Sequence, residues 1–233
     1  MTVAGQTASK ASTAVEAGTP LVVSSPEGPS YVSRGGHKLA GALDAFGYDP
    51  AGKRALDAGA STGGFTDVLL RRGAAHVVAA DVGYGQLAWA LQTDARVTVL
   101  DRTNVRALEP EQVGAPVELV VCDLSFIPLG LVLPALVRCA APDADLMPMV
   151  KPQFEVGRER LPSGGVVRDP GLRAQAVREV ARQAAELGLG ARGVTASPLP
   201  GPSGNVEYFL WLTAGAPPLD DAALRAAVQA GPQ

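Results

Sequence analysis

Four charged side chains that lie far apart in the sequence could together perform proton chemistry. Lys38 lies near the start of a predicted helix, and Glu207 interrupts an otherwise apolar run. Asp123 lies at the carboxyl end of one predicted buried strand, and Lys151 comes directly after another. An alkylamine with an unperturbed pKa of about 10.4 is a poor base, but a second ammonium group and removal from water both favour its neutral form. Carboxylates are too weak as bases for an alcohol, so Asp123 and Glu207 would orient the amines.

The elements that must position these residues alternate between strands and helices. Short β-branched runs and helical patterns follow one another from Ala55 onward, which is typical of a parallel sheet with helices on both faces. The expected strands are 54–57, 76–82, 97–100, 118–123, 145–150, 193–196 and 206–212, the last of them antiparallel. The expected helices are 35–46, 65–72, 84–91, 129–140, 170–187 and 220–230. The fold class is therefore α/β, with a seven-stranded sheet.

The ends of adjacent strands lie at one edge of such a sheet, so Asp123 and Lys151 are expected to meet there. For these two residues alone, a strand-end salt bridge is the competing explanation. Cys122 precedes Asp123 on the strand and faces the opposite way, which disfavours a cysteine nucleophile. His76 is expected to flank a strand, and the two tryptophans, Trp89 and Trp211, to lie in the core.

A glycine-rich segment, residues 56–65, opens a helix at the position where nucleotide cofactors meet a doubly wound sheet. Ser61 stands where a dinucleotide fold needs its middle glycine, and Asp57 would repel a pyrophosphate but suit a cation. S-adenosylmethionine is the expected cofactor, with Asp81 accepting from its ribose; the alternative is a plain turn capped by Asp57. The expected cofactor-binding residues are Asp57, Gly59, Ser61, Gly63, Gly64, Phe65, Asp81 and Val82.

Composition narrows the class of protein further. The chain has 233 residues, 47% of them hydrophobic, and a formal net charge of −3, which argues against a generic nucleic-acid binder. Residues 31–56 and 151–182 are nevertheless net basic, whereas residues 57–150 between them are net acidic. If the fold brings the two basic segments together, they would form a positive face suited to a polyanion. The two cysteines lack metal-binding spacing, so no metal site is expected. Without a membrane span or secretory signal, a cytoplasmic location is expected.

Six motifs in collinear order resemble the TlyA family, enzymes related to the FtsJ ribose methyltransferases, over about residues 31 to 213. They are Ser33-Arg34-Gly35-Gly36-His37-Lys38-Leu39, residues 56–65, Asp81-Val82-Gly83-Tyr84-Gly85-Gln86-Leu87, Asp123-Leu124-Ser125-Phe126, Lys151-Pro152-Gln153-Phe154-Glu155 and Ser203-Gly204-Asn205-Val206-Glu207-Tyr208.

The resemblance implies a Rossmann-like class I methyltransferase sheet and S-adenosylmethionine-dependent 2′-O-methylation of cytidine ribose in ribosomal RNA. The RNA would belong to the small subunit, the large subunit or both. The family's Lys-Asp-Lys-Glu tetrad maps onto Lys38, Asp123, Lys151 and Glu207, with Lys151 removing or stabilising the ribose proton. The expected RNA-contacting residues are Arg34, His37, Arg158, Arg160 and Arg168.

Three segments are expected along the chain. Residues 31–215 would form the methyltransferase domain, and 216–233 a C-terminal tail with a short helix. Residues 1–30 would be a truncated remnant of the small RNA-binding domain with which TlyA-like proteins usually begin, because only the last strands, 3–6 and 21–23, are recognisable. The alternatives are a small-molecule O-methyltransferase and an RNA-binding protein of the kind that carries a haemolysin name.

Overall fold

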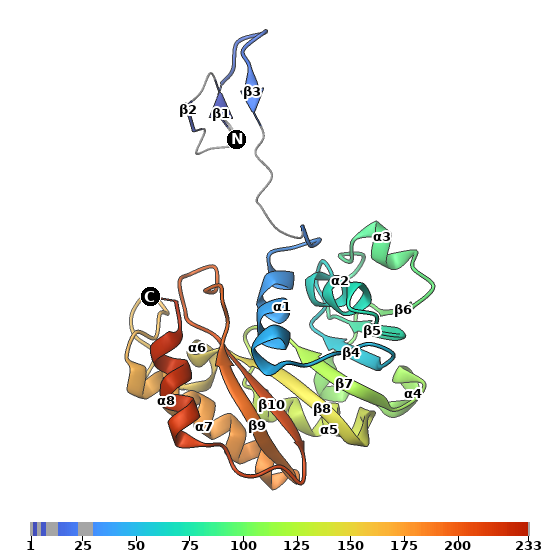
Figure 1. Cartoon of the computed structure of the whole chain (residues 1–233), viewed down its shortest axis with the longest axis vertical. Helices are drawn as coiled ribbons and strands as arrows, with labels where there is room; N and C mark the ends of the chain where they lie inside the picture. The colour runs from blue at the N-terminus through green and yellow to red at the C-terminus, as the bar shows by residue number, and fades with distance from the viewer. Residues whose placement is uncertain (1, 4–5, 8–13, 23–29, 233) are drawn as a thin grey trace. The chain divides into compact units, whose positions relative to one another are not determined.

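The computed structural model describes residues 2–3, 6–7, 14–22 and 30–232, which belong to two units, Met1–Ser30 and Tyr31–Gln233 (Figure 1). The first unit contains the strands β1 (Thr2–Val3), β2 (Gln6–Thr7) and β3 (Leu21–Val22), all antiparallel, in the order β2-β1-β3. Val3 pairs with Gln6, so the prediction of a single strand over residues 3–6 is wrong. Val23, predicted to continue β3, lies outside the described residues.

The second unit is built on a seven-stranded sheet in the order β6-β5-β4-β7-β8-β10-β9, which confirms the predicted α/β class. Its strands are β4 (Arg54–Ala58), β5 (His76–Ala80), β6 (Val97–Leu100), β7 (Val117–Cys122), β8 (Ala140–Val150), β9 (Leu189–Ala196) and β10 (Tyr208–Ala214). The strands β4 to β8 are parallel to one another. β10 lies between β8 and β9, and it is antiparallel to β8, which confirms its predicted direction.

Helices cover both faces of this sheet (Figure 1). They are α1 (Gly35–Phe46), α2 (Gly64–Arg71), α3 (Trp89–Gln92), α4 (Pro110–Val113), α5 (Leu133–Cys139), α6 (Pro152–Glu155), α7 (Pro170–Glu186) and α8 (Asp221–Ala230), with 3₁₀ turns η1 (Val105–Ala107) and η2 (Leu129–Leu131). α7 begins as its sequence predicts: the carboxylate of Asp169 accepts a hydrogen bond from the backbone N–H of Leu172 at 2.9 Å, and Pro170 occupies the first turn.

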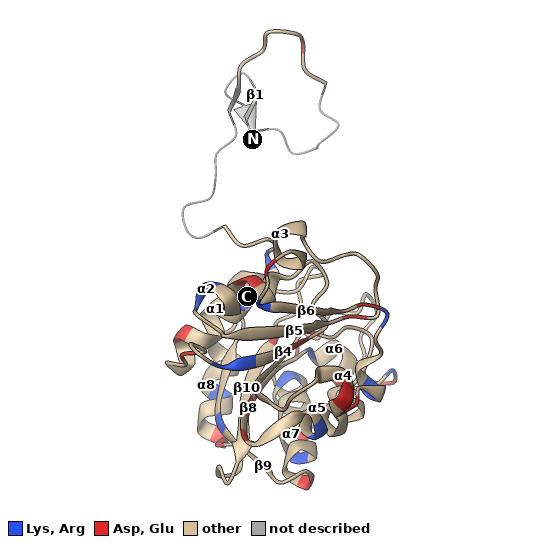
Figure 2. Cartoon of the chain, turned by 90° about the vertical axis from the view of Figure 1, so that its right-hand side faces the viewer, with Lys and Arg blue, Asp and Glu red and all other residues tan. Residues whose placement is uncertain are grey.

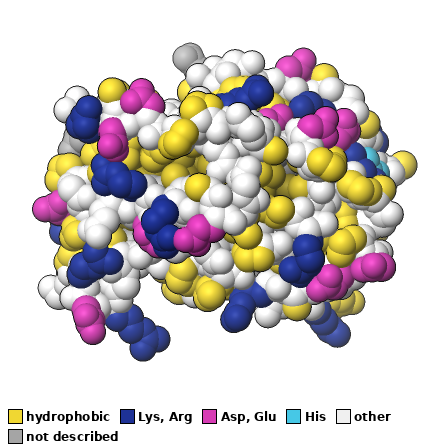
Figure 3. Space-filling view, turned by 90° about the horizontal axis from the view of Figure 1, so that it is seen from below, with side chains coloured by type: hydrophobic (Ala, Val, Ile, Leu, Met, Phe, Trp, Pro, Cys, Tyr) yellow, Lys and Arg dark blue, Asp and Glu magenta, His cyan; other side chains and the backbone are white. Residues whose placement is uncertain are grey.

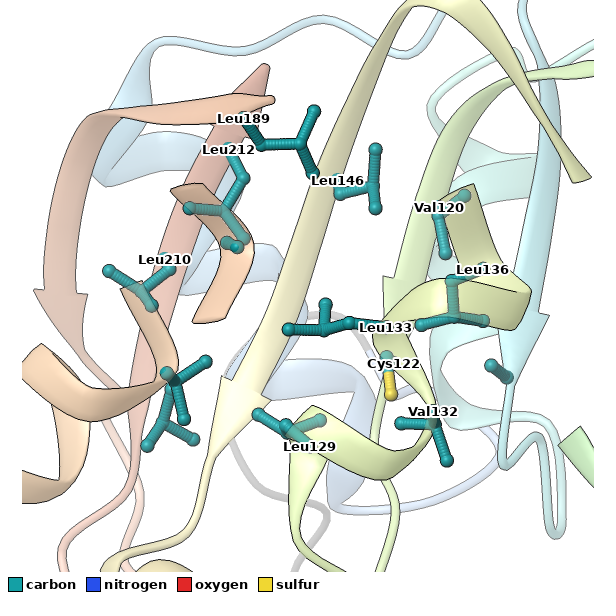
Figure 4. Close-up of a cluster of buried hydrophobic side chains, with 14 of the residues drawn as sticks. Val120, Cys122, Leu129, Val132, Leu133, Leu136, Leu146, Leu189, Leu210 and Leu212 are labelled. Carbon is teal, nitrogen blue, oxygen red and sulfur yellow. The ribbon is translucent and has the colours of Figure 1, made fainter. Parts of the chain in front are cut away.

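The two faces of the sheet have separate cores. On one face α5, α7 and α8 pack on the sheet around leucines such as Leu133 and Leu146, and Cys122 points into this core (Figure 4). Burial raises the pKa of the Cys122 thiol, so the thiol stays protonated. On the other face α1 and α2 pack through Leu39 and Leu69.

The segment between β5 and β6 departs from its predicted structure. A helix was predicted over residues 84–91, but the structure has a helix only over Trp89–Gln92. The reason is a turn at Gly85, which has φ +64° and donates its N–H to Asp101 at 3.0 Å. Trp89 is 76% exposed, so its predicted place in the core is wrong. Trp211 is partly buried and packs against the core of the α1 face, as predicted.

Charges of both signs are spread over the second unit. Acidic and basic residues are both scattered along its ribbon (Figure 2), and blue and magenta side chains are interspersed on the face in Figure 3. His76 flanks a strand, as predicted, with Nε2 at 2.8 Å from the Thr98 hydroxyl. Among the described residues, no helix has the length and apolar character to cross a bilayer.

Candidate active site

The four charged residues form two ion pairs at one edge of the sheet. Lys38 Nζ lies 2.5 Å from Glu207 Oε2, and Lys151 Nζ lies 2.6 Å from Asp123 Oδ1. Lys38 is 8% exposed and Glu207 only 1%, so their charges are withdrawn from water together. A buried charge is tolerated only with such a partner, because removing either one leaves the other desolvated and uncompensated.

The strand topology explains why these residues meet. Asp123 and Lys151 directly follow β7 and β8, two neighbouring parallel strands, so both lie at the carboxyl edge of the sheet. β10 runs in the opposite direction and begins at that edge, where Tyr208 pairs with Val150, so Glu207 lies beside Lys151. Lys38 comes from the first turns of α1.

The tetrad, defined as these four residues, faces a cavity of about 340 Å³ together with the glycine-rich loop. The lining residues from that loop are Gly59, Ala60, Ser61, Thr62, Gly64 and Phe65. Ser125 also lines the cavity, and its hydroxyl accepts a second hydrogen bond from Lys151 Nζ at 2.9 Å. The Lys151 amine is therefore held by two oxygens, those of Asp123 and Ser125, at the edge of this cavity.

A smaller cavity of about 170 Å³ lies on the other side of Gly59. Its lining is Gly59, Asp81, Val82, Asn104, Val105, Leu124, Ser125, Ile127 and Val132. Two of the predicted cofactor-binding residues, Asp81 and Val82, therefore lie here, and Gly59 and Ser125 belong to both cavities. The predictions missed Asn104, Leu124 and Ile127, whose only sequence signal is that they follow strand ends.

The Asp81 carboxylate shapes the glycine-rich loop. Its Oδ2 accepts from the backbone N–H of Ser61 at 2.8 Å, and its Oδ1 accepts from Gly83 at 2.7 Å. Ser61 adopts φ +48°, a left-handed conformation that is uncommon for a residue with a Cβ, and the bond to Asp81 stabilises it. A carboxylate oxygen has further lone pairs, so these two bonds leave Asp81 able to accept from a ligand.

Asp57 differs from its expected placement. Its side chain is fully buried and is absent from the described lining of both cavities; it lies beneath the loop against α2. Oδ2 accepts from the Thr66 backbone N–H at 2.9 Å and from the Thr66 hydroxyl at 2.7 Å, while Oδ1 has no hydrogen-bond partner among the described residues. Burial, the largest cause, raises the pKa of Asp57 to about 7.

This raised pKa predicts a pH dependence of stability. The folded state holds the Asp57 proton more tightly than the unfolded chain, so the stabilisation is complete below about pH 4 and is lost as the pH rises to about 7. Asp57→Asn removes this titration. Between pH 5 and 8, wild type is expected to lose roughly 2 kcal/mol more unfolding free energy than the variant, measured by urea denaturation. Parallel pH profiles for the two proteins would contradict the assignment.

Two residues of the Asp-Leu-Ser-Phe motif were missed as site residues. Ser125 holds Lys151, as described above. Phe126 is 89% exposed with φ +65°, and its ring centroid lies 5.2 Å from that of Phe154. A strained, exposed aromatic residue beside a cluster of charged groups is unusual and points to a binding role.

The predicted RNA-contacting residues are spread over two segments. Arg34 is exposed and lines the larger cavity, whereas His37 packs edge-on against Tyr31 with ring centroids 5.0 Å apart. The other three, Arg158, Arg160 and Arg168, are exposed on the segment between α6 and α7. Within the described parts of the chain, Arg34 is the member of this group that reaches the cavity.

Comparisons with known proteins agree with this geometry. The FtsJ-like methyltransferase family model matches residues 31–214. The 16S/23S rRNA (cytidine-2′-O)-methyltransferase TlyA of Mycobacterium tuberculosis H37Rv is 65% identical over 208 residues, covering 89% of this chain and 78% of the relative. The 23S rRNA (cytidine-2′-O)-methyltransferase TlyA of Campylobacter jejuni is 35% identical, covering 78% and 70%.

A solved structure from Streptococcus thermophilus that carries a hemolysin name has a TM-score of 0.84 and 38% identity, covering 88% of this chain and 75% of that one. This chain is therefore similar to that protein in fold as well as in sequence. The chain belongs to the FtsJ-like methyltransferase family, and within it to the TlyA proteins.

Proposed function

We propose that the chain transfers a methyl group from S-adenosylmethionine to the 2′-oxygen of a cytidine ribose in ribosomal RNA. The observation that carries this proposal is the meeting of two lysines and two carboxylates at a cavity walled by the glycine-rich loop. The names of the Mycobacterium and Campylobacter relatives support the choice of substrate. A ribosomal RNA substrate also implies a cytoplasmic location.

The residues at the two cavities fit S-adenosylmethionine. The smaller cavity is mostly apolar with one carboxylate, Asp81, which suits a nucleoside, and the larger one has the polar groups that an amino-acid end requires. The two cavities meet at Gly59 and Ser125, so one elongated ligand can enter both. Asp57 lies beneath the loop and supports it through its hydrogen bonds to Thr66, not through contact with the ligand.

The two ion pairs of the tetrad have different roles in the proposed reaction. S-adenosylmethionine, when bound, supplies an electrophilic methyl group on a positively charged sulfur. The amine of Lys151 takes the proton of the ribose hydroxyl as the methyl group is transferred, while Asp123 and Ser125 hold that amine in place. The Lys38–Glu207 pair lies beside it and fixes the wall of the cavity. Such fixed positioning supplies much of the rate enhancement for a transfer between two bound molecules.

A further cavity on the opposite side of the tetrad suits the target nucleoside. It has a volume of about 360 Å³ and shares Lys151, Ser125 and Glu207 with the larger cofactor cavity. Phe126 and Phe154 contribute aromatic surface, and unstacked RNA bases bind to such rings. The exposed arginines between α6 and α7 are expected to contact the phosphate backbone.

Replacing Gly59 by alanine is expected to weaken cofactor binding. A Cβ at this position would lie 2.6 Å from the backbone oxygen of Asp123, and the residue has φ +90°. We expect the Kd for S-adenosylhomocysteine, measured by calorimetry, to rise at least about tenfold, because the loop must shift. Gly47→Ala is the matched control: it also has positive φ (+61°) but no atom within 4 Å of the added Cβ. Equal Kd values for the two variants would contradict the loop assignment.

The activity itself is tested with methyl-labelled cofactor and separated ribosomal subunits. The RNA is digested with alkali, which cannot cleave next to a methylated 2′-oxygen. Label in uncleaved dinucleotides with cytidine on the 5′ side is the expected result. Label released in mononucleotides would indicate base methylation, and unlabelled RNA from both subunits would favour the small-molecule alternative.

A further inference from the structure

The cavity proposed for the target nucleoside has one wall that the tetrad does not supply. Leu161, Gly164 and Gly165 contribute to it from the segment between α6 and α7. This segment, residues 157–166, is called the wall loop below. It has no helix or strand of its own, so its position depends on turn hydrogen bonds, on the packing of Leu161 and on contacts at its ends.

One buried side chain holds the end of the wall loop. Asn205 is 2% exposed, and its Oδ1 accepts a hydrogen bond from the backbone N–H of Val167 at 2.9 Å. Its Nδ2 donates to the backbone oxygen of Gly165, also at 2.9 Å. Since one partner is a donor and the other an acceptor, both ends of the amide are used, and neither Asp nor Leu can replace it.

The same residue belongs to the turn that carries the tetrad carboxylate. Asn205 lies two residues before Glu207, and its backbone oxygen accepts from the N–H of Gly201 at 2.8 Å, which closes the turn. Gly201 and Asn205 itself both line the nucleoside cavity. Asn205 therefore connects the wall loop to the turn next to the tetrad through one rigid amide.

The neighbouring contacts make this an anchor rather than a chance pairing. The backbone oxygen of Val167 accepts from Nε of Arg173, itself buried, at 2.8 Å, so both polar groups of Val167 are held. The Val167 side chain packs with Val156 and Ala176 in a small separate core. Val156 precedes the wall loop and Val167 follows it, so the loop is held at both ends, and Leu161 packs on the same core from within the loop.

We propose that Asn205 is a positioning residue for the RNA substrate: it holds the wall loop against the tetrad and so completes the nucleoside cavity. The proposal deepens the proposed function, on which its kinetic part rests. Asn205 touches no reacting atom in this arrangement. Its loss is expected to loosen the loop and enlarge the cavity, and thereby to affect substrate binding more than cofactor binding.

The first test needs no catalysis. In the full chain, Asn205→Ala is expected to speed tryptic cleavage at Arg158 and Arg160 at least about fivefold, because the loop reaches the protease more often once its anchor is gone. Asp220→Ala, which removes the N-terminal cap of α8 far from the loop, is the matched control for general destabilisation. Equal cleavage rates in Asn205→Ala and Asp220→Ala would overturn the proposed anchor.

The second test separates positioning from a merely structural role. Asn205→Ala is expected to raise the KM for ribosomal RNA about tenfold, with the Kd for S-adenosylhomocysteine within twofold of wild type. Asn205→Asp keeps the acceptor for Val167 but loses the donor to Gly165, so it should not restore the KM. A fall in kcat with unchanged KM would overturn the proposal. If wild type methylates no RNA, the proposed function fails, while the cleavage test still decides whether the anchor exists.

Discussion

Lys151→Ala is expected to lower kcat for methyl transfer by about 10²–10⁴-fold, the usual contribution of a positioned acid–base group. The side chain is buried and is held by Asp123 at 2.6 Å and by the Ser125 hydroxyl at 2.9 Å, so its amine has a fixed position at the cavity. Asp123 is partly exposed, so water can solvate it when its partner is lost. Single-turnover transfer of labelled methyl to ribosomal subunits measures this effect.

Lys151→Arg is the matched control for charge. A guanidinium keeps the positive charge and can bond to Asp123, but it does not lose its proton in proteins and so cannot act as a base. We expect it to be as inactive as the alanine variant, with the Kd for S-adenosylhomocysteine within about threefold of wild type in both. An arginine variant that keeps most of the activity would show that Lys151 acts only through its charge.

Lys38→Met is expected to cost about 3–5 kcal/mol of unfolding free energy at pH 7.5, the usual cost of breaking a buried ion pair. Glu207 is 1% exposed and pairs with Lys38 at 2.5 Å, so without the lysine its charge is left desolvated. Methionine replaces most of the apolar volume of the lysine stem, which limits the effect of a cavity. Urea denaturation measures the loss.

The double variant Lys38→Met with Glu207→Gln separates stability from activity. Removing both charges together leaves no uncompensated group, so most of the lost unfolding free energy should return. Methyl transfer should not return, because the wall of the cavity has lost both charged groups of the pair. A single variant that loses less than about 1 kcal/mol, or a double variant that regains activity, would contradict the role given to this pair.

The fold was largely predictable because strand and helix periodicity are local signals. β-branched runs and turn residues predict the seven strands, including the antiparallel direction of the last one. Asp169-Pro170 predicts the start of α7. The failures lie where local pattern and tertiary contacts disagree. Residues 84–91 look helical, but Gly85 binds Asp101 sixteen residues away and holds a turn. β1 likewise pairs with β3, where Val3 lies opposite Leu21, a partner far away in the sequence.

The tetrad could be inferred because strand topology brings the ends of β7, β8 and β10 to one edge whatever the details of packing. Side-chain direction is less accessible from sequence. Asp57 turns beneath the loop toward Thr66 instead of into a cavity, and Phe126 turns outward because its backbone is left-handed. The spacing of residues in the sequence does not predict either side-chain direction, because each depends on which neighbouring side chains occupy the space around it.

The central claim is that the glycine-rich loop presents a methyl donor to the tetrad. The most direct test is a crystal structure of the full chain soaked with S-adenosylhomocysteine. Density is predicted to place the adenosine in the cavity beside Asp81 and Val82, with the sulfur in the cavity shared by Lys38 and Lys151. Density that directs the sulfur away from Lys151, or ligand bound at a different surface, would contradict the claim.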